Sequence, residues 1–390
     1  MKSRLCISAI ALILAIAIWL PLLHLFFRPD IGDLGLEKGV SRIADQLAAH
    51  HLQIWTNPDL RNRELAQMRQ LNPEWDFMSR TFLVMALASI ALRDESRIPQ
   101  CLETIDLVIE NTLLIEQEDG FQDFLLGYGY ADNWKVQPPK SIFVDGEISL
   151  MIGARRMVAD RADYQHLMAE RIGNMVAQMT LSPVLSAESY PDECWVFCNT
   201  IALAAIRLGD VLDHSNHSEF LREWVETAKL HLVEPQSGLL ISAYAVDGTP
   251  LPNGPGPEGT SIWMACHMLQ VVDGAFAQDQ YQRAKAQLGR SLLGFGYSRE
   301  WPRAFAGVMD IDSGPIVPFV EASASASGLA LLGAAGFSDK KYLRQLMTSL
   351  NIAGFPTRKN GTLCYQASNP VGDAVLLYAL VQGPLWEKAK

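Results

Sequence analysis

Several short motifs that identify common enzyme classes are missing from this sequence of 390 residues. It contains no phosphate-binding loop, no His-Glu-x-x-His metal motif and no Gly-x-Ser-x-Gly nucleophile elbow. The Gly-x-Gly at Gly294 and Gly296 has no predicted strand before it, so it does not indicate dinucleotide binding. Positive charge is scarce too, because the net charge is -11 and no basic stripe with interleaved aromatic residues occurs. We therefore expect no cofactor and no nucleic-acid partner.

Cysteines that could form a disulfide framework are also few. One of the six cysteines, Cys6, lies in an N-terminal apolar run, which leaves an odd number in the rest of the chain. Cys194 and Cys198 are four residues apart, so we expect them to share a helix face and to remain thiols. Zinc held by these two cysteines with Cys266 and His267 is a weaker hypothesis, because the spacing is not typical of zinc sites. The sequence predicts neither a disulfide scaffold nor a metal site.

The N-terminus carries a long apolar run instead. Residues Leu5 to Phe27 lack formal charge and are long enough to cross a bilayer core of about 30 Å, with Lys2 and Arg4 before them. A cleavable signal peptide would share these features, but no clear small-x-small cleavage site follows. We therefore predict an uncleaved membrane anchor over residues 1–30 and a globular domain over 36–388. The positive-inside bias places this domain outside the cytoplasm, on the periplasmic face of the inner membrane if the source is bacterial.

The feature that organises the rest of the chain is a recurrence. Six apolar, helix-like runs each follow a short loop rich in proline, glycine, aromatic and acidic residues, and the loops cover residues 72–76, 138–147, 189–195, 254–261, 310–315 and 368–373. Six more strongly charged helical stretches lie between these runs. Regular spacing of helix pairs indicates a repeat or ring architecture. We predict an all-α fold, an (α/α)6 barrel of six helical hairpins, with all six loops at one end.

Within this plan we expect the first helix over Glu37 to Trp55 and an outer helix over Asp279 to Leu293. A short strand hairpin is predicted around Gly238 to Tyr244, with its turn at Val246 to Thr249. Other strand signals are sparse.

The six loops supply the candidate site. Each has a carboxylate at or near a helix start, and capping of the helix explains any single one of them. Capping does not require the aromatic residues beside them, and aromatic walls with convergent carboxylates indicate a small-molecule pocket. The catalytic candidates are Asp76, Glu147, Asp192, Asp312 and Cys198, and the candidates for substrate contact are Trp75, Phe143, Tyr190, Trp195, Asn199, Trp263 and Asp310.

Three of these segments carry a resemblance. The run Ser189-Tyr-Pro-Asp-Glu-Cys-Trp-Val-Phe-Cys-Asn199, together with residues 142–153 and 312–315, resembles the linalool dehydratase/isomerase family. The resemblance implies a cofactor-free ring of six hairpins in which acid/base groups and two cysteines add or remove water on a monoterpene alcohol. The second family cysteine matches Cys198, whereas the first falls on Ser189, a further substrate-contact candidate, and a family histidine falls on Glu147. The change at Glu147 makes the set more similar to six-hairpin glycosidases, which use two carboxyl groups.

Three functional hypotheses follow. The first is a cofactor-free lyase or isomerase acting on a hydroxylated small molecule, with Glu147 and Asp76 or Asp312 as acid and base and Cys198 assisting. The second is an inverting glycoside hydrolase acting on an envelope glycan. The third is a non-catalytic binding or scaffold module. The expected partners are a terpenoid alcohol or a glycan as substrate, and the membrane; the sequence leaves the question of a homo-oligomer open.

Overall fold

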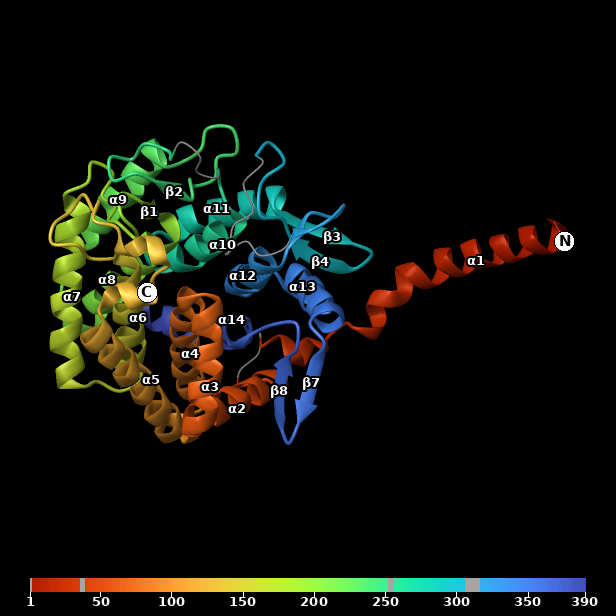
Figure 1. Cartoon of the computed structure of the whole chain (residues 1–390), viewed down its shortest axis with the longest axis horizontal. Helices are drawn as coiled ribbons and strands as arrows, with labels where there is room; N and C mark the ends of the chain where they lie inside the picture. Colours follow the sequence, from red (N-terminus) through yellow and green to blue (C-terminus); the bar gives the residue numbers. More distant parts are fainter. Residues whose placement is uncertain (1, 36–38, 252–255, 306–315) are drawn as a thin grey trace.

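The chain forms two concentric layers of helices around one axis, with a single helix projecting away from them (Figure 1). This architecture comes from a computed structural model, which describes residues 2–35, 39–251, 256–305 and 316–390. The inner layer consists of α4 (Pro73–Arg93), α6 (Ile142–Val158), α8 (Val196–Asp213), α10 (Gly259–Met268), α12 (Ala324–Gly336) and α14 (Pro370–Val381). The outer layer consists of α5 (Ile98–Asp119), α7 (Ala162–Thr180), α9 (Ser218–His231), α11 (Gly274–Gln287), α13 (Lys340–Ala353) and α2 (Arg42–Thr56).

The inner layer is a closed ring. Each inner helix packs against the next one along the chain, and α14 packs against α4. The outer helix α2 packs against α14, so the first helix of the barrel completes the last hairpin. The fold is therefore an (α/α)6 barrel, as predicted from the recurrence of helix pairs.

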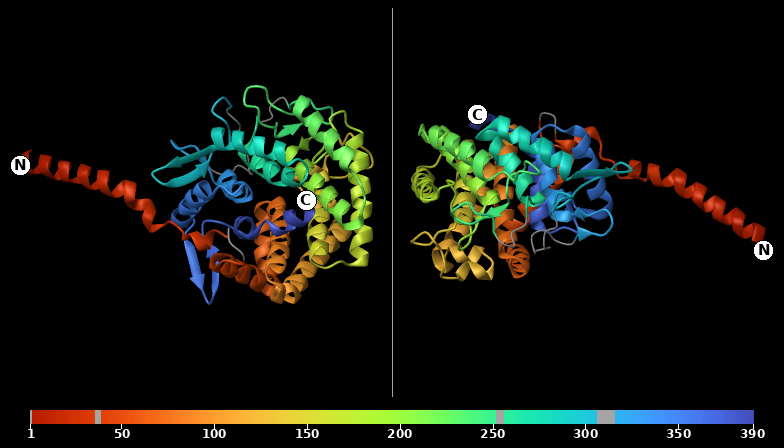
Figure 2. Two further views of the ribbon diagram at one scale, coloured as in Figure 1. Left: turned by 180° about the vertical axis from the view of Figure 1, so that it is seen from behind. Right: turned by 90° about the horizontal axis from the view of Figure 1, so that it is seen from above.

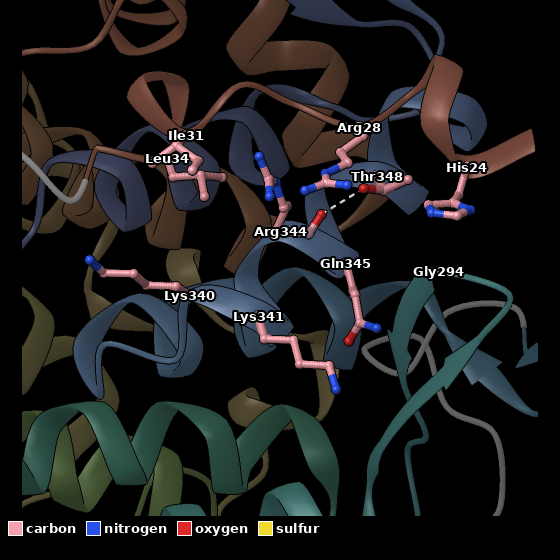
Figure 3. A pocket seen from close by; sticks show the side chains of 10 residues that line it. All are labelled: His24, Arg28, Ile31, Leu34, Gly294, Lys340, Lys341, Arg344, Gln345 and Thr348. Carbon is pink, nitrogen blue, oxygen red and sulfur yellow. Dashed lines mark hydrogen bonds between the residues drawn. The ribbon is translucent and has the colours of Figure 1, made fainter. Parts of the chain in front are cut away.

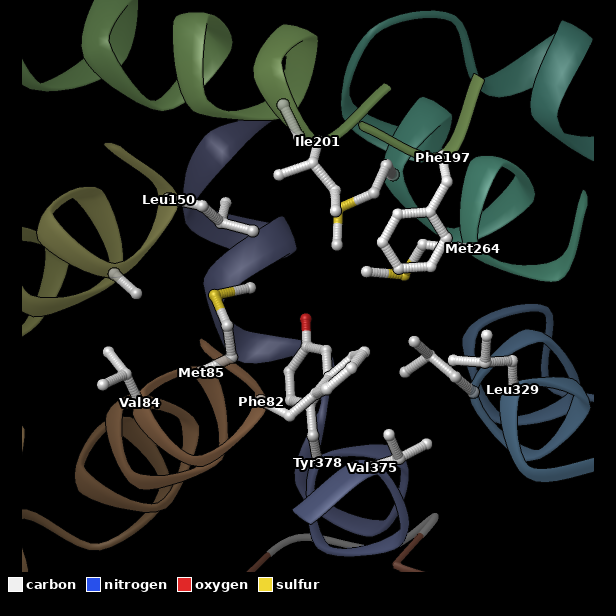
Figure 4. Packing of buried hydrophobic residues seen from close by; sticks show 14 of the residues in the cluster. Phe82, Val84, Met85, Leu150, Phe197, Ile201, Met264, Leu329, Val375 and Tyr378 are labelled. Atoms are coloured by element: carbon white, nitrogen blue, oxygen red, sulfur yellow. The ribbon is translucent and has the colours of Figure 1, made fainter. Parts of the chain in front are cut away.

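Apolar side chains fill the axis of the ring. Figure 4 shows Phe82, Leu150, Met264 and Tyr378 meeting there from different inner helices. Inner helices are buried on nearly all sides, which explains why α4 is apolar around most of its circumference. Small residues permit the close approach of these helices, as at Gly146, where a Cβ would lie 3.3 Å from the backbone nitrogen of Ala202.

The opposite ends of the barrel differ. The short helix α15 (Pro384–Ala389) packs against α4, α6 and α8. In this helix, the indole Nε1 of Trp386 donates a hydrogen bond to the carbonyl oxygen of His267 at 3.2 Å. Lys388 Nζ donates one to the carbonyl oxygen of Met157 at 2.8 Å. Both acceptors belong to the carboxyl-terminal halves of inner helices. This helix therefore closes the carboxyl end of the ring, and the amino ends of the inner helices face the other way.

Several elements differ from the sequence-based expectation. An additional helix, α3 (Pro58–Leu71), precedes α4, and α2 begins at Arg42 rather than near residue 37. The outer helix α11 ends at Gln287, and the hairpin of β3 (Gly289–Leu292) and β4 (Phe295–Ser298) replaces its predicted last turn. A second hairpin joins β7 (Pro356–Lys359) and β8 (Thr362–Tyr365). The sequence predicted neither hairpin.

The remaining strands are short. Two of them, β5 (Ile316–Val317) and β6 (Ala322–Ser323), extend the β3–β4 sheet. The predicted hairpin near residue 240 is present in part, because Tyr244 forms an antiparallel bridge with Pro250 across the turn at Val246 to Thr249. The strand on its other side, β2 (Ala243–Tyr244), pairs with β1 (Cys194–Trp195). Cys194 therefore lies in a strand, and the prediction that it shares a helix face with Cys198 was wrong.

The projecting helix is α1 (Lys2–Leu22), followed by a 3-10 turn, η1 (Leu23–Phe26) (Figure 2). Among the described residues, two helices are long and apolar enough to cross a membrane, and the other is the buried inner helix α4. The N-terminal segment has the features shared by membrane anchors and signal sequences.

Candidate active site

A pocket of about 460 Å³ opens at the amino end of the barrel. All six inner helices contribute residues from their first turns or from the loop just before them. The lining includes Glu74, Trp75, Met78, Phe82, Tyr128, Phe143, Tyr190, Trp195, Phe197, Cys198, Glu258, Ser261, Glu300, Leu329, Asn369 and Val375. The starts of all six inner helices thus meet around one hollow, and its size suits a small molecule. The loop over residues 310–315 lies outside the described residues.

Aromatic rings make up much of the wall. Trp75, Phe82, Phe143 and Phe197 line the pocket, and Phe82 and Phe197 also reach the apolar axis below it (Figure 4). Tyr128 stacks on Tyr190 with ring centroids 4.3 Å apart. A substrate in this pocket would therefore lie mainly against apolar surface, with a few polar groups to orient it.

Two buried carboxyl groups line the pocket from opposite sides. Glu74 lies in the first turn of α4 and is 7% exposed, and Glu258 directly precedes α10 and is 4% exposed. Because α4 and α10 are three positions apart in a ring of six, they are opposite each other across the axis. An opposed pair of carboxyl groups can divide acid and base work.

Each member of this pair is held in place locally. The hydroxyl of Tyr190 donates a hydrogen bond to Glu74 and accepts one from the backbone nitrogen of Leu126 at 2.9 Å. Burial, followed by the charge of Glu74, raises the pKa of Tyr190, so its hydroxyl stays protonated and remains a donor. At Glu258, the backbone nitrogen donates to Ser242 Oγ at 2.6 Å.

Glu300 is a third carboxylate in the lining, with a connecting role. Its carboxylate accepts hydrogen bonds from the backbone nitrogen of Thr260 at 3.0 Å and from Ser323 Oγ at 2.5 Å. These contacts join the start of α10 to the start of α12. Glu300 therefore fixes the wall in which Glu258 lies.

Cys198 lies in the first turn of α8 and lines the pocket. Its neighbour in sequence, Cys194, is fully buried outside the lining, and burial raises the pKa of its thiol well above the usual value. Cys194 is thus a buried thiol, whereas Cys198 can meet a bound molecule.

Glu147 lies beneath the pocket rather than in its lining. It is one helical turn along α6 from Phe143, which lines the pocket, and one turn from Leu150 on the apolar axis. The side chain is 1% exposed, and neither carboxyl oxygen has a hydrogen-bond partner within the described ranges of the chain. Burial raises the pKa of Glu147 to about 8, and the nearby Thr81 hydroxyl opposes this only weakly. At neutral pH Glu147 is a protonated acid inside an apolar core.

The structure places the three candidate aspartates away from this pocket or outside the described residues. Asp76 is fully buried against two arginines, with Arg80 Nε 3.1 Å and Arg69 Nη1 3.0 Å from its carboxylate. Asp192 lies on a loop, where it pairs with Lys135 at 3.2 Å. Asp312, like the contact candidate Asp310, lies outside the described residues.

The candidates for substrate contact divide into two groups. Trp75, Phe143, Tyr190 and Trp195 line the pocket. Ser189, Asn199 and Trp263 do not, and each makes structural hydrogen bonds: Ser189 Oγ accepts from the backbone of Trp195, Asn199 bonds both backbone groups of Ala187, and Trp263 Nε1 donates to Ser298 Oγ at 2.8 Å. Sequence reasoning did not select Glu74, Tyr128, Glu258 or Glu300.

Groups of three or more His, Cys, Asp or Glu side chains suited to a metal ion were not found in the part of the chain that the structure describes.

Two solved structures and one family of sequences are similar to this chain. The structure of the GH76A α-1,6-mannanase from Salegentibacter sp. HEL1_6 is similar, with a TM-score of 0.48 and 13% identity over 78% of this chain and 90% of that chain. The unsaturated glucuronyl hydrolase from Streptococcus agalactiae has a TM-score of 0.47 and 8% identity over 77% of this chain and 80% of the other. The sequence pattern of the linalool dehydratase/isomerase family matches residues 145–371, more than half of the chain. The chain belongs to the linalool dehydratase/isomerase family.

Proposed function

We propose that this protein is a membrane-anchored, cofactor-free enzyme that adds or removes water on a hydroxylated, largely apolar small molecule. One observation carries the proposal: Glu74 and Glu258 line a mainly aromatic pocket from opposite sides, with Cys198 in the wall between their helices. Membership of the linalool dehydratase/isomerase family supports a terpenoid alcohol as the substrate class. The N-terminal apolar helix supports the anchor, with the barrel outside the cytoplasm.

In this proposal one glutamic acid donates a proton to the substrate hydroxyl, so the C–O bond breaks and water leaves. The opposite glutamate removes a proton from the neighbouring carbon, and the electrons of that C–H bond form the double bond. Exchange of one proton with solvent restores the two groups, and the reverse sequence hydrates the alkene. Positive charge that develops on carbon is stabilised by the faces of Trp75 and Phe143.

Three further residues have roles other than those of Glu74 and Glu258 in this proposal. Cys198 assists by orienting the hydroxyl or exchanging its proton, since it is the family cysteine that this chain retains. Glu147 acts from beneath Phe143 as a neutral acid that affects the pocket without touching the substrate. Asp312 is kept as a candidate base that belongs to the loop before α12.

A second candidate is hydrolysis of an envelope glycan. An opposed pair of carboxyl groups also suits an inverting glycosidase, in which one protonates the leaving oxygen and the other activates water. The aromatic wall would then stack against a sugar ring. The two candidates differ in the bond that is cleaved, so a product assay separates them.

The test compares Glu74→Gln and Glu258→Gln with Glu219→Gln, a fully solvated position on the outer helix α9. Each variant is incubated with linalool and related monoterpene alcohols, and in parallel with aryl glycosides, and the products are quantified by chromatography. We expect turnover of the alcohols to fall by roughly 10²–10⁴-fold in the two pocket variants and to stay unchanged in the control. Unchanged turnover in both pocket variants would remove the acid and base assignment. Release of sugar in place of water would select the hydrolase.

A further inference from the structure

A second hollow, of about 340 Å³, lies where the N-terminal segment meets the barrel. Figure 3 shows its wall, formed by the segment after α1 on one side and by α13 on the other. Arg28 belongs to the N-terminal segment, and Lys340, Lys341 and Arg344 belong to the first turns of α13. Four cations from two separate segments thus line one hollow, and this hollow shares no lining residue with the active-site pocket.

These cations have no internal counter-ion that accounts for them. Among the described residues, none of the four forms an ion pair with a carboxylate; Arg344 Nε instead donates to the carbonyl oxygen of Pro29 at 3.4 Å. Burial and the charge of Arg28 lower the pKa of Arg344, and Asp30 only partly opposes this. Cations in the first turn of a helix also oppose the helix dipole. An anion in the hollow would offset the repulsion between Arg28 and Arg344.

The surroundings of the hollow indicate which kind of anion this is. The hollow lies directly after the apolar helix α1, and His24, in its wall, lies against Gly294 at the tip of the β3–β4 hairpin. Large apolar side chains are exposed on both of these segments: Phe26 is 72% exposed and Leu292 is 52% exposed. The hollow and its apolar rim lie at the end of a helix that can cross a bilayer. The rim would then lie at the level of the acyl chains, and the cationic hollow at the level of the headgroups.

We propose that this hollow binds the phosphate of an anionic phospholipid, and that the rim formed by Phe26 and Leu292 enters the bilayer beside it. The site would fix the orientation of the barrel on the membrane instead of leaving it free to rotate about the tether. The inference rests on α1 as an uncleaved anchor and is independent of the reaction in the active-site pocket.

The experiment uses the full chain in a neutral detergent, titrated with phosphatidylglycerol or phosphatidylcholine and followed by native mass spectrometry. We expect one phosphatidylglycerol to bind roughly tenfold more tightly than phosphatidylcholine. The double variant Arg28→Gln with Arg344→Gln should lose this preference. The matched control, Arg63→Gln with Arg222→Gln, removes two exposed cations from α3 and from the outer helix α9 and should keep it.

Three results would overturn the proposal. One is equal affinity for the two lipids in the wild type, and another is the same loss of preference in both double variants. The third is displacement of the lipid by inorganic phosphate at a concentration equal to the dissociation constant of the lipid. That result would assign the hollow to a soluble anion. As a control for folding, the melting temperature of each double variant is compared with that of the wild type. Similar melting temperatures establish that the difference lies in lipid binding and not in folding.

Discussion

At the scale of single residues, Glu147 has the least favourable surroundings of the acidic groups near the pocket. Its carboxyl group is buried in the inner ring, and no oxygen completes a hydrogen bond. A charge there would have to be desolvated without compensation, which is why burial raises the pKa of Glu147 to about 8. The protein therefore binds a proton at neutral pH at this position.

This proton makes stability depend on pH, and Glu147→Gln should remove the dependence. In the unfolded chain Glu147 titrates near its ordinary value of 4.5, so between pH 4.5 and about 8 the folded state binds a proton that the unfolded state has released. The contribution of Glu147 to stability must then fall as pH rises through this window, by roughly 5 kcal/mol in total.

The measurement is the urea midpoint at pH 5, 7 and 9. From pH 5 to pH 9 the stability of the wild type should fall relative to that of the glutamine variant, because an amide does not titrate. Asp373, whose pKa burial raises to about 7, and His51 and His267, whose pKa burial lowers to about 3, are present in both proteins and contribute equally to the two slopes. Equal slopes in the two proteins would contradict the account.

Asp76 should prove structural rather than catalytic. Removing its charge with Asp76→Asn leaves Arg80 buried without its partner, which we expect to cost about 3–5 kcal/mol. The folded fraction should keep its turnover. Chemical denaturation and activity per folded molecule are measured together, with the exposed Asp59→Asn as the control. Normal stability with lost turnover would return Asp76 to the catalytic group.

Helix geometry explains why Glu74 lines the pocket and Asp76 does not. Residues two apart on a helix differ by about 200° around its axis, so a pair of neighbouring acids points in opposite directions. The apolar run that follows Asp76 made this residue the candidate, whereas α4 begins earlier, at Pro73, with Asn72 as its cap. Both residues are typical start signals, so the correct face could have been found. The burial of Glu147 without a partner could not, because it depends on α4 lying against α6.

At the scale of elements, the helix pairs could be predicted, whereas the β3–β4 and β7–β8 hairpins could not. Long inner helices remain apolar over many residues, which makes them recognisable in the sequence. A strand of four residues, such as β3, is too short for its hydrophobic pattern to distinguish it from the last turn of a helix. The stop signal was Gly289, where a Cβ would lie 2.7 Å from the carbonyl oxygen of Lys285. Only the packing of the hairpin on α13 decides that the chain turns there.

The start of α10 is the element that fixes Glu258, and Gly259→Ala tests it. A Cβ at Gly259 would lie 2.6 Å from the carbonyl oxygen of Arg299, a backbone atom that cannot rotate away. We expect a stability loss of about 1–3 kcal/mol from this overpacking, with lower turnover because Glu258 moves.

Thermal unfolding of Gly259→Ala is compared with that of Gly173→Ala on the outer helix α7. A Cβ at Gly173 meets nothing within 4 Å, and alanine is the better helix former, so this control should be as stable as the wild type or more so. If both variants behave alike, the tight contact at α10 does not hold the pocket wall.

At the scale of the whole molecule, the ring closes through its two ends, since α2 near the N-terminus packs against α14 near the C-terminus. The sequence predicted this ring, because the helix pairs recur along the chain. Which acids meet in the pocket depends on the rotation of each helix, and that is set by packing across the ring.

The tether is tested by sequencing the N-terminus of the protein recovered from membranes. We expect the chain to begin before α1 and to resist extraction by alkaline carbonate, because the apolar helix spans the bilayer. A chain that lacks residues 1–27 should be released from the membrane fraction. A mature N-terminus after Phe27 in the full-length preparation would identify a signal sequence.

The central claim is that the pocket reversibly removes water, and oxygen exchange tests it most directly. The full chain is incubated with linalool in water labelled with ¹⁸O, and the alcohol and any alkene are analysed by mass spectrometry. The account predicts incorporation of the label into the alcohol, with alkene formation, and a decrease of roughly 10²-fold or more in Glu258→Gln. Absence of label and alkene with linalool and related monoterpene alcohols, in a protein that is folded and intact, would contradict it.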